Sequence, residues 1–320
     1  MGFGEIPTIE NYKFFLDVAF KAARIKASSK RKDIQGDKIN RIKILEFMKM
    51  ETVESVLRAK LEKIVQVYPN FDDLTEFYTQ LVKTTMVYSE LKKSLGAMNW
   101  AQKKISEFTR QYKEKIRKCG EIDAIKNYSK QYFGRIASVL KQISKNLMYL
   151  EEGRRIMRDF PSIKEGLFTI AITGFPNIGK TTLLSKITDS KPEINSYAFT
   201  TKTLNMGYMK HNNQKIQFID TPGSLNRLDK MNYIEQMAYL AIKYCAHAMI
   251  YVYDLTEPFP LKDQKKLLLE LKSFDKPIIL YLSKTDILPK EVVSEFTNKV
   301  KAITDIEVLK EKILEEFKNY

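Results

Sequence analysis

The stretch GFPNIGKTT, residues 174–182, fits the phosphate-loop pattern GxxxxGK[ST] without a gap. Its context fits as well, because an apolar run at residues 167–173 precedes it and an amphipathic pattern at residues 181–187 follows it. A strand that enters a glycine-containing loop and leaves it as a helix can cradle phosphate groups. We expect these residues to contact a nucleotide: Gly174, Phe175, Pro176, Asn177, Ile178, Gly179, Lys180, Thr181 and Thr182.

Four positions of this stretch have specific expected roles. Glycine at 174 and 179 lets the backbone curl, so that successive N–H groups point at phosphate oxygens. Lys180 can reach the β- and γ-phosphates, and the Thr181 hydroxyl is placed to bind Mg²⁺. The alternative is a chance match in an ordinary glycine turn, against which the flanking strand and helix argue.

A second motif, DTPG at residues 220–223, follows an apolar strand. Asp220 can bind Mg²⁺ through its hydration shell, and the Gly223 N–H can contact a γ-phosphate. Between the two motifs, Thr201 (or its neighbour Thr200) can supply a second hydroxyl to Mg²⁺. A segment that contacts only the γ-phosphate and its Mg²⁺ is ordered only in the triphosphate state.

A third motif, SKTD at residues 283–286, follows the apolar strand PIILYL. A carboxylate at Asp286 can accept from guanine N1–H and N2–H₂ together, a pair of donors that adenine lacks. The aliphatic stem of Lys284 can cover the base, and Ser283 can bond the loop backbone. The motif favours GTP and GDP over ATP.

Residues 161–320 alternate strand and helix patterns, which predicts a doubly wound α/β domain with one antiparallel edge hairpin around Asn212 and Asn213. The expected strands are residues 167–173, 203–210, 215–220, 248–254 and 277–283, with a short one near Val300. The expected helices are residues 181–187, 233–244 and 261–274, one from Glu291, and a last one to Tyr320.

Residues 1–160 show helical periodicity and no strand pattern, which predicts an all-α helical-bundle domain. The expected helices are residues 9–26, 38–68, 72–95, 99–118 and 121–158. Gly96 is interpreted as a break or a tight packing point. Gly134 would allow either close helix packing or close approach to a phosphate backbone.

The net charge of +15 is concentrated in the first half of the chain. Residues 1–160 hold 32 Lys and Arg against 20 Asp and Glu, whereas residues 161–320 hold 22 against 19. Residues 103–145 alone hold 12 against four. This imbalance favours a polyanionic partner, although a lysine-rich solvated surface would look the same. The aromatic residues interleaved there favour packing over base stacking: Tyr112, Tyr128, Tyr132 and Phe133.

Several function classes find no support in the sequence. Cys119 and Cys245 stand far apart and are interpreted as reduced thiols, and His211 and His247 stand alone, which argues against a zinc site. No apolar run reaches the length of a membrane span, and no signal-peptide pattern opens the chain. We expect a cytoplasmic protein without a membrane partner.

Taken together, the phosphate loop, FTT at residues 199–201, DTPG and a near-NKxD motif resemble a translation-factor-class GTPase of the Obg-related branch. More narrowly, GFPNIGKTTLLSKIT (residues 174–188) is similar to the Nog family, that of nucleolar GTP-binding protein 1. The helical half resembles the same family in PTIENYKFFLDVAFKAA (residues 7–23) and LKKSLGAMNWAQKKI (residues 91–105).

This resemblance implies a GTPase that acts in assembly of the large ribosomal subunit, with the helical domain contacting ribosomal RNA. It implies an archaeal-type member, because eukaryotic members carry a C-terminal extension, and a monomer off the ribosome. Ser283 departs from the family's usual Asn. The last guanine motif is faint, at Lys301 and Ala302. No glutamine follows DTPG, so intrinsic hydrolysis should be slow.

Two alternatives stay open at this point. One is an RNA-binding scaffold with a weakened or inactive nucleotide pocket, which Ser283 and the faint last motif would explain. The other is a GTPase with a different target, such as tRNA modification or a membrane-associated partner.

In related GTPases, an asparagine at the position of Asn177 helps to hold a K⁺ ion that acts like an arginine finger. We therefore expect the GTPase to turn over faster in KCl than in NaCl at equal ionic strength, measured by phosphate release. Equal rates in the two salts would contradict a role for K⁺ and for Asn177 as its ligand.

Overall fold

The computed structural model describes residues 3, 6–164, 166–188, 193–195, 204–222, 233–256 and 259–320. It divides into two compact units. The first comprises residues 1–73 and 82–158, and the second comprises residues 74–81 and 159–320.

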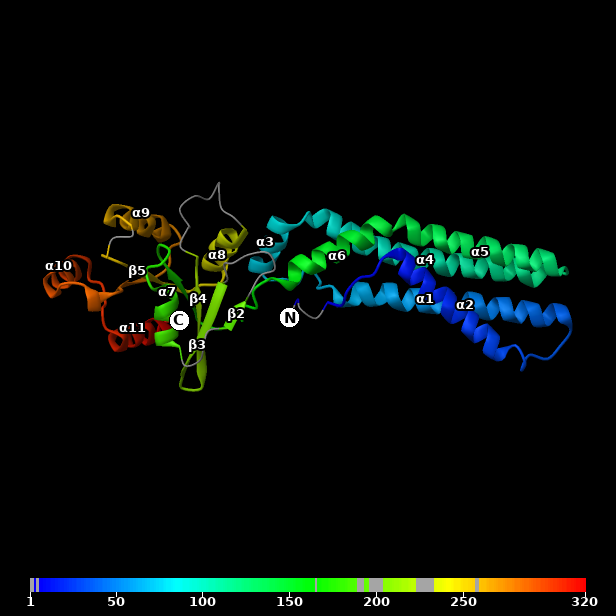
Figure 1. The fold of residues 1–320 in the computed structure, drawn as a ribbon, viewed down its shortest axis with the longest axis horizontal. Helices are drawn as coiled ribbons and strands as arrows, with labels where there is room; N and C mark the ends of the chain where they lie inside the picture. Colours follow the sequence, from blue (N-terminus) through cyan, green and yellow to red (C-terminus); the bar gives the residue numbers. More distant parts are fainter. Residues whose placement is uncertain are drawn as a thin grey trace. The chain divides into compact units, whose positions relative to one another are not determined.

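The first unit is helical, as predicted. Figure 1 shows long helices of this unit running side by side as a bundle. Its helices are α1 (Tyr12–Lys30), α2 (Lys38–Val67), α4 (Tyr88–Lys118), α5 (Ile122–Gln142) and α6 (Ser144–Arg158). Helix α3 (Glu76–Thr85) begins in the second unit and ends in the first.

The bundle core is mainly apolar, and it holds buried polar groups that are hydrogen-bonded between helices, as at Tyr132 and at Ser129. The Tyr132 hydroxyl on α5 lies 3.0 Å from Thr109 Oγ1 on α4 and 3.2 Å from the carbonyl oxygen of Met50 on α2. These bonds satisfy the polar end of a fully buried tyrosine and join three helices. Tyr112 is buried too, so the interpretation of these two tyrosines as packing residues is confirmed.

Two predicted helix boundaries are wrong. The chain breaks after α3, at Met86 and Val87, and not at Gly96, which lies inside α4 with open space around it. The break has a tertiary cause, because the Tyr149 hydroxyl on α6 accepts from the Val87 N–H and donates to the Val87 carbonyl. The predicted helix 121–158 is two helices, α5 and α6, separated at buried Ile143.

Gly134 lies on the exposed side of α5. A Cβ at this position would meet no atom within 4 Å, so the glycine does not serve close helix packing. That part of the prediction is wrong, and approach to a phosphate backbone stays a prediction.

The second unit is built around a mixed sheet in the order β2-β3-β4-β1-β5-β6. Strands β4, β1, β5 and β6 are parallel to one another. Strand β3 is antiparallel to both of its neighbours, β4 and the edge strand β2. The predicted doubly wound α/β fold with an antiparallel edge hairpin is confirmed. The strands are β1 (Thr169–Thr173), β2 (Glu193–Asn195), β3 (Leu204–His211), β4 (Gln214–Asp220), β5 (Ala248–Tyr253) and β6 (Ile278–Leu282).

The helices of this unit also follow the predicted order. They are α7 (Lys180–Ile187), α8 (Tyr233–Tyr244), α9 (Leu261–Lys272), α10 (Lys290–Val300) and α11 (Ile306–Lys318). Asn212 and Asn213 both have positive φ and close the β3–β4 hairpin, as predicted. Strand β2 was not predicted. The strand expected near Val300 is instead a single parallel bridge between Tyr281 and Ile303.

Residues 74–81 belong to the second unit through a buried tyrosine. The Tyr78 hydroxyl donates to the Pro161 carbonyl at 2.8 Å and accepts from the Ile163 N–H at 3.1 Å. These bonds fix the segment that leads into β1, whose residues Thr169–Thr173 are all buried. No helix among the described residues is long and apolar enough to cross a membrane.

Candidate nucleotide site

The phosphate loop runs from the end of β1 to the start of α7. Gly174 has φ +134°, and a Cβ there would lie 2.8 Å from the carbonyl oxygen of Val252 on β5. Gly179, with φ +95°, is the N-cap of α7. Both positions therefore require glycine: the first because β5 passes too close for a side chain, and both because L side chains rarely adopt these angles. The loop has the geometry that the sequence predicts.

The Lys180 side chain is buried and lies across the loop. Its Nζ donates to the carbonyl oxygens of Gly174 at 3.0 Å and Phe175 at 2.6 Å. Burial lowers the pKa of Lys180 to about 8, against an opposing attraction from Asp220. A poorly solvated ammonium group gains from an anionic partner, so a phosphate oxygen is a favourable ligand at this position.

Two of the three residues predicted to hold Mg²⁺, Thr181 and Asp220, lie together. Thr181 Oγ1 donates to Asp220 Oδ2 at 2.6 Å, although the two are 39 positions apart. The Thr221 hydroxyl donates to the Ile172 carbonyl at 2.8 Å and ties the DTPG motif to β1. Hydroxyl and carboxylate oxygens are the ligands that Mg²⁺ prefers, so this pair fits the ion.

Asn205 completes this cluster and was not predicted. It lies on β3 directly opposite Asp220 on β4, and its Nδ2 donates to Asp220 Oδ2 at 3.1 Å. Thr181 and Asn205 donate to the same carboxylate oxygen, Oδ2, so the two bonds together fix the orientation of Asp220. Only the antiparallel register between β3 and β4 brings the two residues together, and the register follows from the Asn212–Asn213 turn.

Ser283 joins the guanine motif to the phosphate loop. Its hydroxyl lies 2.7 Å from the Ile178 carbonyl oxygen and 2.9 Å from that of Tyr253, and the side chain is buried. The predicted bond from Ser283 to the loop backbone is therefore present.

Lys284 and Asp286 follow at the carboxyl end of β6. Lys284 has φ +54°, and its Nζ donates to Asp254 Oδ2 at 2.6 Å. Asp286 lies in a short 3-10 turn, Thr285–Ile287, and is exposed. Its carboxylate bonds none of the described residues, so it is available to a base.

Asp254 was not predicted, and it is fully buried at the end of β5. Burial acts to raise the pKa of Asp254, but hydrogen bonds from Lys284 and Thr256 outweigh it and hold the pKa below its usual value. The charged carboxylate therefore anchors the end of Lys284, which holds the lysine stem in one orientation.

The remaining predicted residues of the phosphate loop differ in how far their side chains are buried. Asn177 has φ +60° and an exposed side chain, and Pro176 and Thr182 are not buried. Phe175 and Ile178 are buried, and Phe175 packs on Phe259 with ring centroids 4.5 Å apart. The buried side chains of Phe175 and Ile178 anchor the phosphate loop in the apolar core.

Lys301 and Ala302 precede the bridge at Ile303 and follow the end of α10. Their contact with a base stays a prediction. Three further predicted residues lie outside the described residues: Thr200, Thr201 and Gly223.

Comparison with known families agrees with this geometry. The family model described as the NOG1 N-terminal helical domain matches residues 3–164, about half of the chain. The chain belongs to the Nog family. The model described as 50S ribosome-binding GTPase matches residues 169–284, from β1 to the guanine motif.

Individual relatives extend over most of the chain. An uncharacterized protein of Methanocaldococcus jannaschii is 36% identical over 78% of this chain and 71% of its own length. Nucleolar GTP-binding protein 1 of Saccharomyces cerevisiae is 30% identical over 95% of this chain. This chain covers 48% of that protein, so it spans about half the length of such relatives.

Among solved structures, the G domain of the T. maritima FeoB iron transporter covers 47% of this chain and 98% of its own. The sequence identity is 26% and the TM-score is 0.39.

Asn205 should affect Mg²⁺ binding through its hydrogen bond to Asp220. Replacing Asn205 with Ala removes the bond that orients Asp220, so we expect about a tenfold higher Mg²⁺ concentration for half-maximal GTP binding. The measurement is a Mg²⁺ titration of binding of a fluorescent GTP analogue. Lys215→Ala, an exposed change on β4, is the control and should leave the titration unchanged. A normal Mg²⁺ requirement in Asn205→Ala would show that Asn205 does not orient Asp220.

Proposed function

We propose that this protein binds GTP with Mg²⁺ and hydrolyses it to GDP as a conformational switch in assembly of the large ribosomal subunit. The helical unit contacts ribosomal RNA. The observation that carries the proposal is the Thr181–Asp220 contact of 2.6 Å beside a complete phosphate loop, on a chain whose other half is strongly basic.

The nucleotide part of the proposal rests on the site's own residues. The loop and Lys180 bind the phosphates, Thr181 and Asp220 hold the metal ion, and Asp286 pairs with guanine. A bound Mg²⁺ neutralises charge on the phosphate oxygens. Because the Ser283 hydroxyl still ties the loop to β5 and β6, the geometry favours a competent pocket over an inactive one.

Hydrolysis is slow in the isolated protein. Ser224 and Leu225 follow DTPG, so no glutamine there orients the attacking water. An intrinsic turnover on the order of 10⁻⁴ to 10⁻² per second is typical of GTPases that lack an activator. K⁺ held with the help of Asn177 would act as a partial substitute.

The ribosomal part of the proposal rests on charge and on family membership. The excess of Lys and Arg in residues 1–160 suits a polyanion. The names of the matching family models and relatives refer to a 50S ribosome-binding GTPase and to a nucleolar GTP-binding protein.

Co-sedimentation with large-subunit precursors tests the proposal. We expect the chain to co-sediment when bound to a non-hydrolysable GTP analogue and to be released, at least about fivefold, when bound to GDP. Lys180→Ala should abolish this difference because it removes the phosphate ligand, whereas Lys186→Ala, an exposed change on the same helix, should preserve it. Equal co-sedimentation of the unaltered chain in both nucleotide states would contradict a switch.

A further inference from the structure

A basic hollow lies on the first unit in the groove between α2 and α4. Its volume is about 840 Å³. We use the name basic hollow for the site formed by Arg58, Asn99, Gln102, Lys103, Ser106, Glu107 and Arg110. Arg58 comes from α2 and the others from α4. Every lining residue is polar or charged.

The lining residues of α4 form one continuous stripe. Asn99, Lys103, Ser106 and Arg110 are spaced by four, three and four positions, which places them on one face of a helix. The residues of α4 that point into the bundle core are a separate set: Leu91, Ser94, Met98, Ala101, Ile105, Thr109, Tyr112 and Ile116. The stripe is therefore not needed for packing.

The positive charge of the basic hollow is only partly neutralised. Neither Lys103 nor Arg110 forms an ion pair with any of the described residues. Arg58 reaches Glu54 only at 3.9 Å. The one carboxylate in the lining, Glu107, accepts from Lys104 at 2.7 Å and from Gln111 at 3.1 Å. The hydrogen bond from Lys104 and, to a smaller extent, the charge of Arg110 lower the pKa of Glu107. Glu107 therefore offsets at most one of the three positive charges in the lining.

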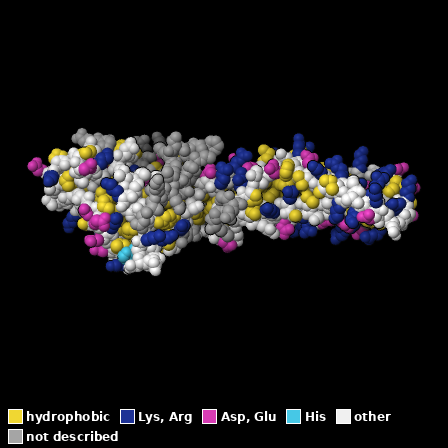
Figure 2. All heavy atoms as spheres, turned by 60° about the horizontal axis from the view of Figure 1, so that its bottom comes forward, with side chains coloured by type: hydrophobic (Ala, Val, Ile, Leu, Met, Phe, Trp, Pro, Cys, Tyr) yellow, Lys and Arg dark blue, Asp and Glu magenta, His cyan; other side chains and the backbone are white. Residues whose placement is uncertain are grey.

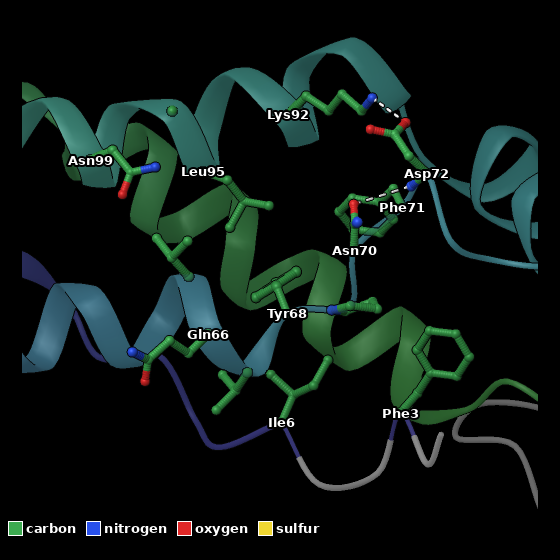
Figure 3. Close-up of a pocket in the computed structure, with 14 residues that line it drawn as sticks. Phe3, Ile6, Gln66, Tyr68, Asn70, Phe71, Asp72, Lys92, Leu95 and Asn99 are labelled. Atoms are coloured by element: carbon green, nitrogen blue, oxygen red, sulfur yellow. Dashed lines mark hydrogen bonds and ion pairs between the residues drawn. The ribbon is translucent and has the colours of Figure 1, made fainter.

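A neighbouring hollow differs from the basic hollow in the polarity of its lining. It shares Asn99 with the basic hollow, has a volume of about 960 Å³, and is lined by apolar residues such as Ile6, Tyr68 and Leu95. Its only lysine, Lys92, donates to Asp72 at 2.6 Å, and Figure 3 shows the pair on one side of the hollow with Asn99 at the far end. The lysine of that hollow is paired, whereas two cations of the basic hollow, Lys103 and Arg110, form no ion pair with any of the described residues.

The three cations of the basic hollow outnumber the one carboxylate in its lining, so they repel one another and gain from a shared anion. Two of them, Lys103 and Arg110, lie two helical turns apart, about 10 Å along the axis, and a nucleic-acid backbone presents phosphates in series. Ser106, Gln102 and Asn99 add neutral donors for phosphate oxygens and 2′-hydroxyls. Figure 2 shows that Lys and Arg are numerous over the helical unit, so the basic hollow lies in a positive field that attracts a polyanion.

We infer that the basic hollow between α2 and α4 binds the sugar–phosphate backbone of ribosomal RNA. This inference rests on the proposed function and adds the site and its chemistry. Recognition is through backbone phosphates and not through base edges, so it depends on charge and on the shape of the RNA.

The test compares two triple variants of the full chain that remove the same charge. The site variant is Arg58→Gln, Lys103→Gln and Arg110→Gln. The control variant is Lys13→Gln, Lys21→Gln and Arg24→Gln, three exposed positions on α1, which packs against α2 and α5. Binding to purified large-subunit ribosomal RNA is measured from 50 to 300 mM salt, and thermal unfolding confirms that both variants fold.

We expect the site variant to bind at least about tenfold more weakly at 100 mM salt. The slope of log K against log salt should fall in magnitude by about two to three, because each lost phosphate contact removes about 0.7 to 0.9. The control variant should keep both the affinity within about threefold and most of the slope.

Equal losses in the two variants would overturn the inference and leave the proposed RNA contact standing, since net charge alone would then explain binding. Normal RNA binding by a site variant that no longer co-sediments with large-subunit precursors would overturn it too, and would indicate an acidic protein partner. Absence of RNA binding by the unaltered chain would overturn the proposed RNA contact itself.

Discussion

The close approach of the Gly174 backbone to β5 is the constraint on which the nucleotide site depends. Strand β1 lies between β4 and β5, and the chain that leaves β1 passes close to Val252 of β5. At residue 174 a side chain would collide with the Val252 carbonyl. The carbonyl oxygens of Gly174 and Phe175 accept hydrogen bonds from Lys180 Nζ. Helix α7 begins at Lys180, directly after the loop.

The strand order explains why residues from distant motifs meet there. Parallel strands β4, β1, β5 and β6 bring their carboxyl ends to one edge. Asp220 comes from β4, Asp254 from β5 and Ser283 from β6, and each bonds either the phosphate loop region or a neighbour in the site. The guanine motif is thus physically tied to the phosphate loop through the Ser283 hydroxyl.

Much of this site could be predicted from the sequence, because its motifs are local. Glycines, a lysine and a threonine within nine residues specify a loop and its chemistry together. Asn205 and Asp254 could not be predicted in this way, since their roles arise from strand register and from an ion pair across 30 positions. The helix break at Val87 could not be predicted for the same reason. The Tyr149 hydroxyl, 62 positions away, bonds the Val87 backbone there, and no glycine or proline marks the position.

The two units differ in the kind of chemistry they offer. The second unit gathers oxygen ligands and one buried lysine at a sheet edge, which suits a small charged ligand with a metal ion. The first unit has a packed core and a polar face that carries unpaired cations, which suits an extended polyanion. In the proposed switch the guanine motif selects which nucleotide occupies the second unit.

Guanine specificity through Asp286 is measured most directly by comparing the affinities for GDP and xanthosine diphosphate, by calorimetry, in the unaltered chain and in Asp286→Asn. A carboxylate accepts from guanine N1–H and N2–H₂, whereas an amide can donate to the carbonyl oxygen that xanthine carries at C2. We expect the unaltered chain to prefer GDP and Asp286→Asn to prefer xanthosine diphosphate, with GDP affinity reduced roughly 10- to 100-fold. An unchanged preference for GDP in Asp286→Asn, or no GDP binding by the unaltered chain in the presence of Mg²⁺, would contradict a guanine site built on this loop.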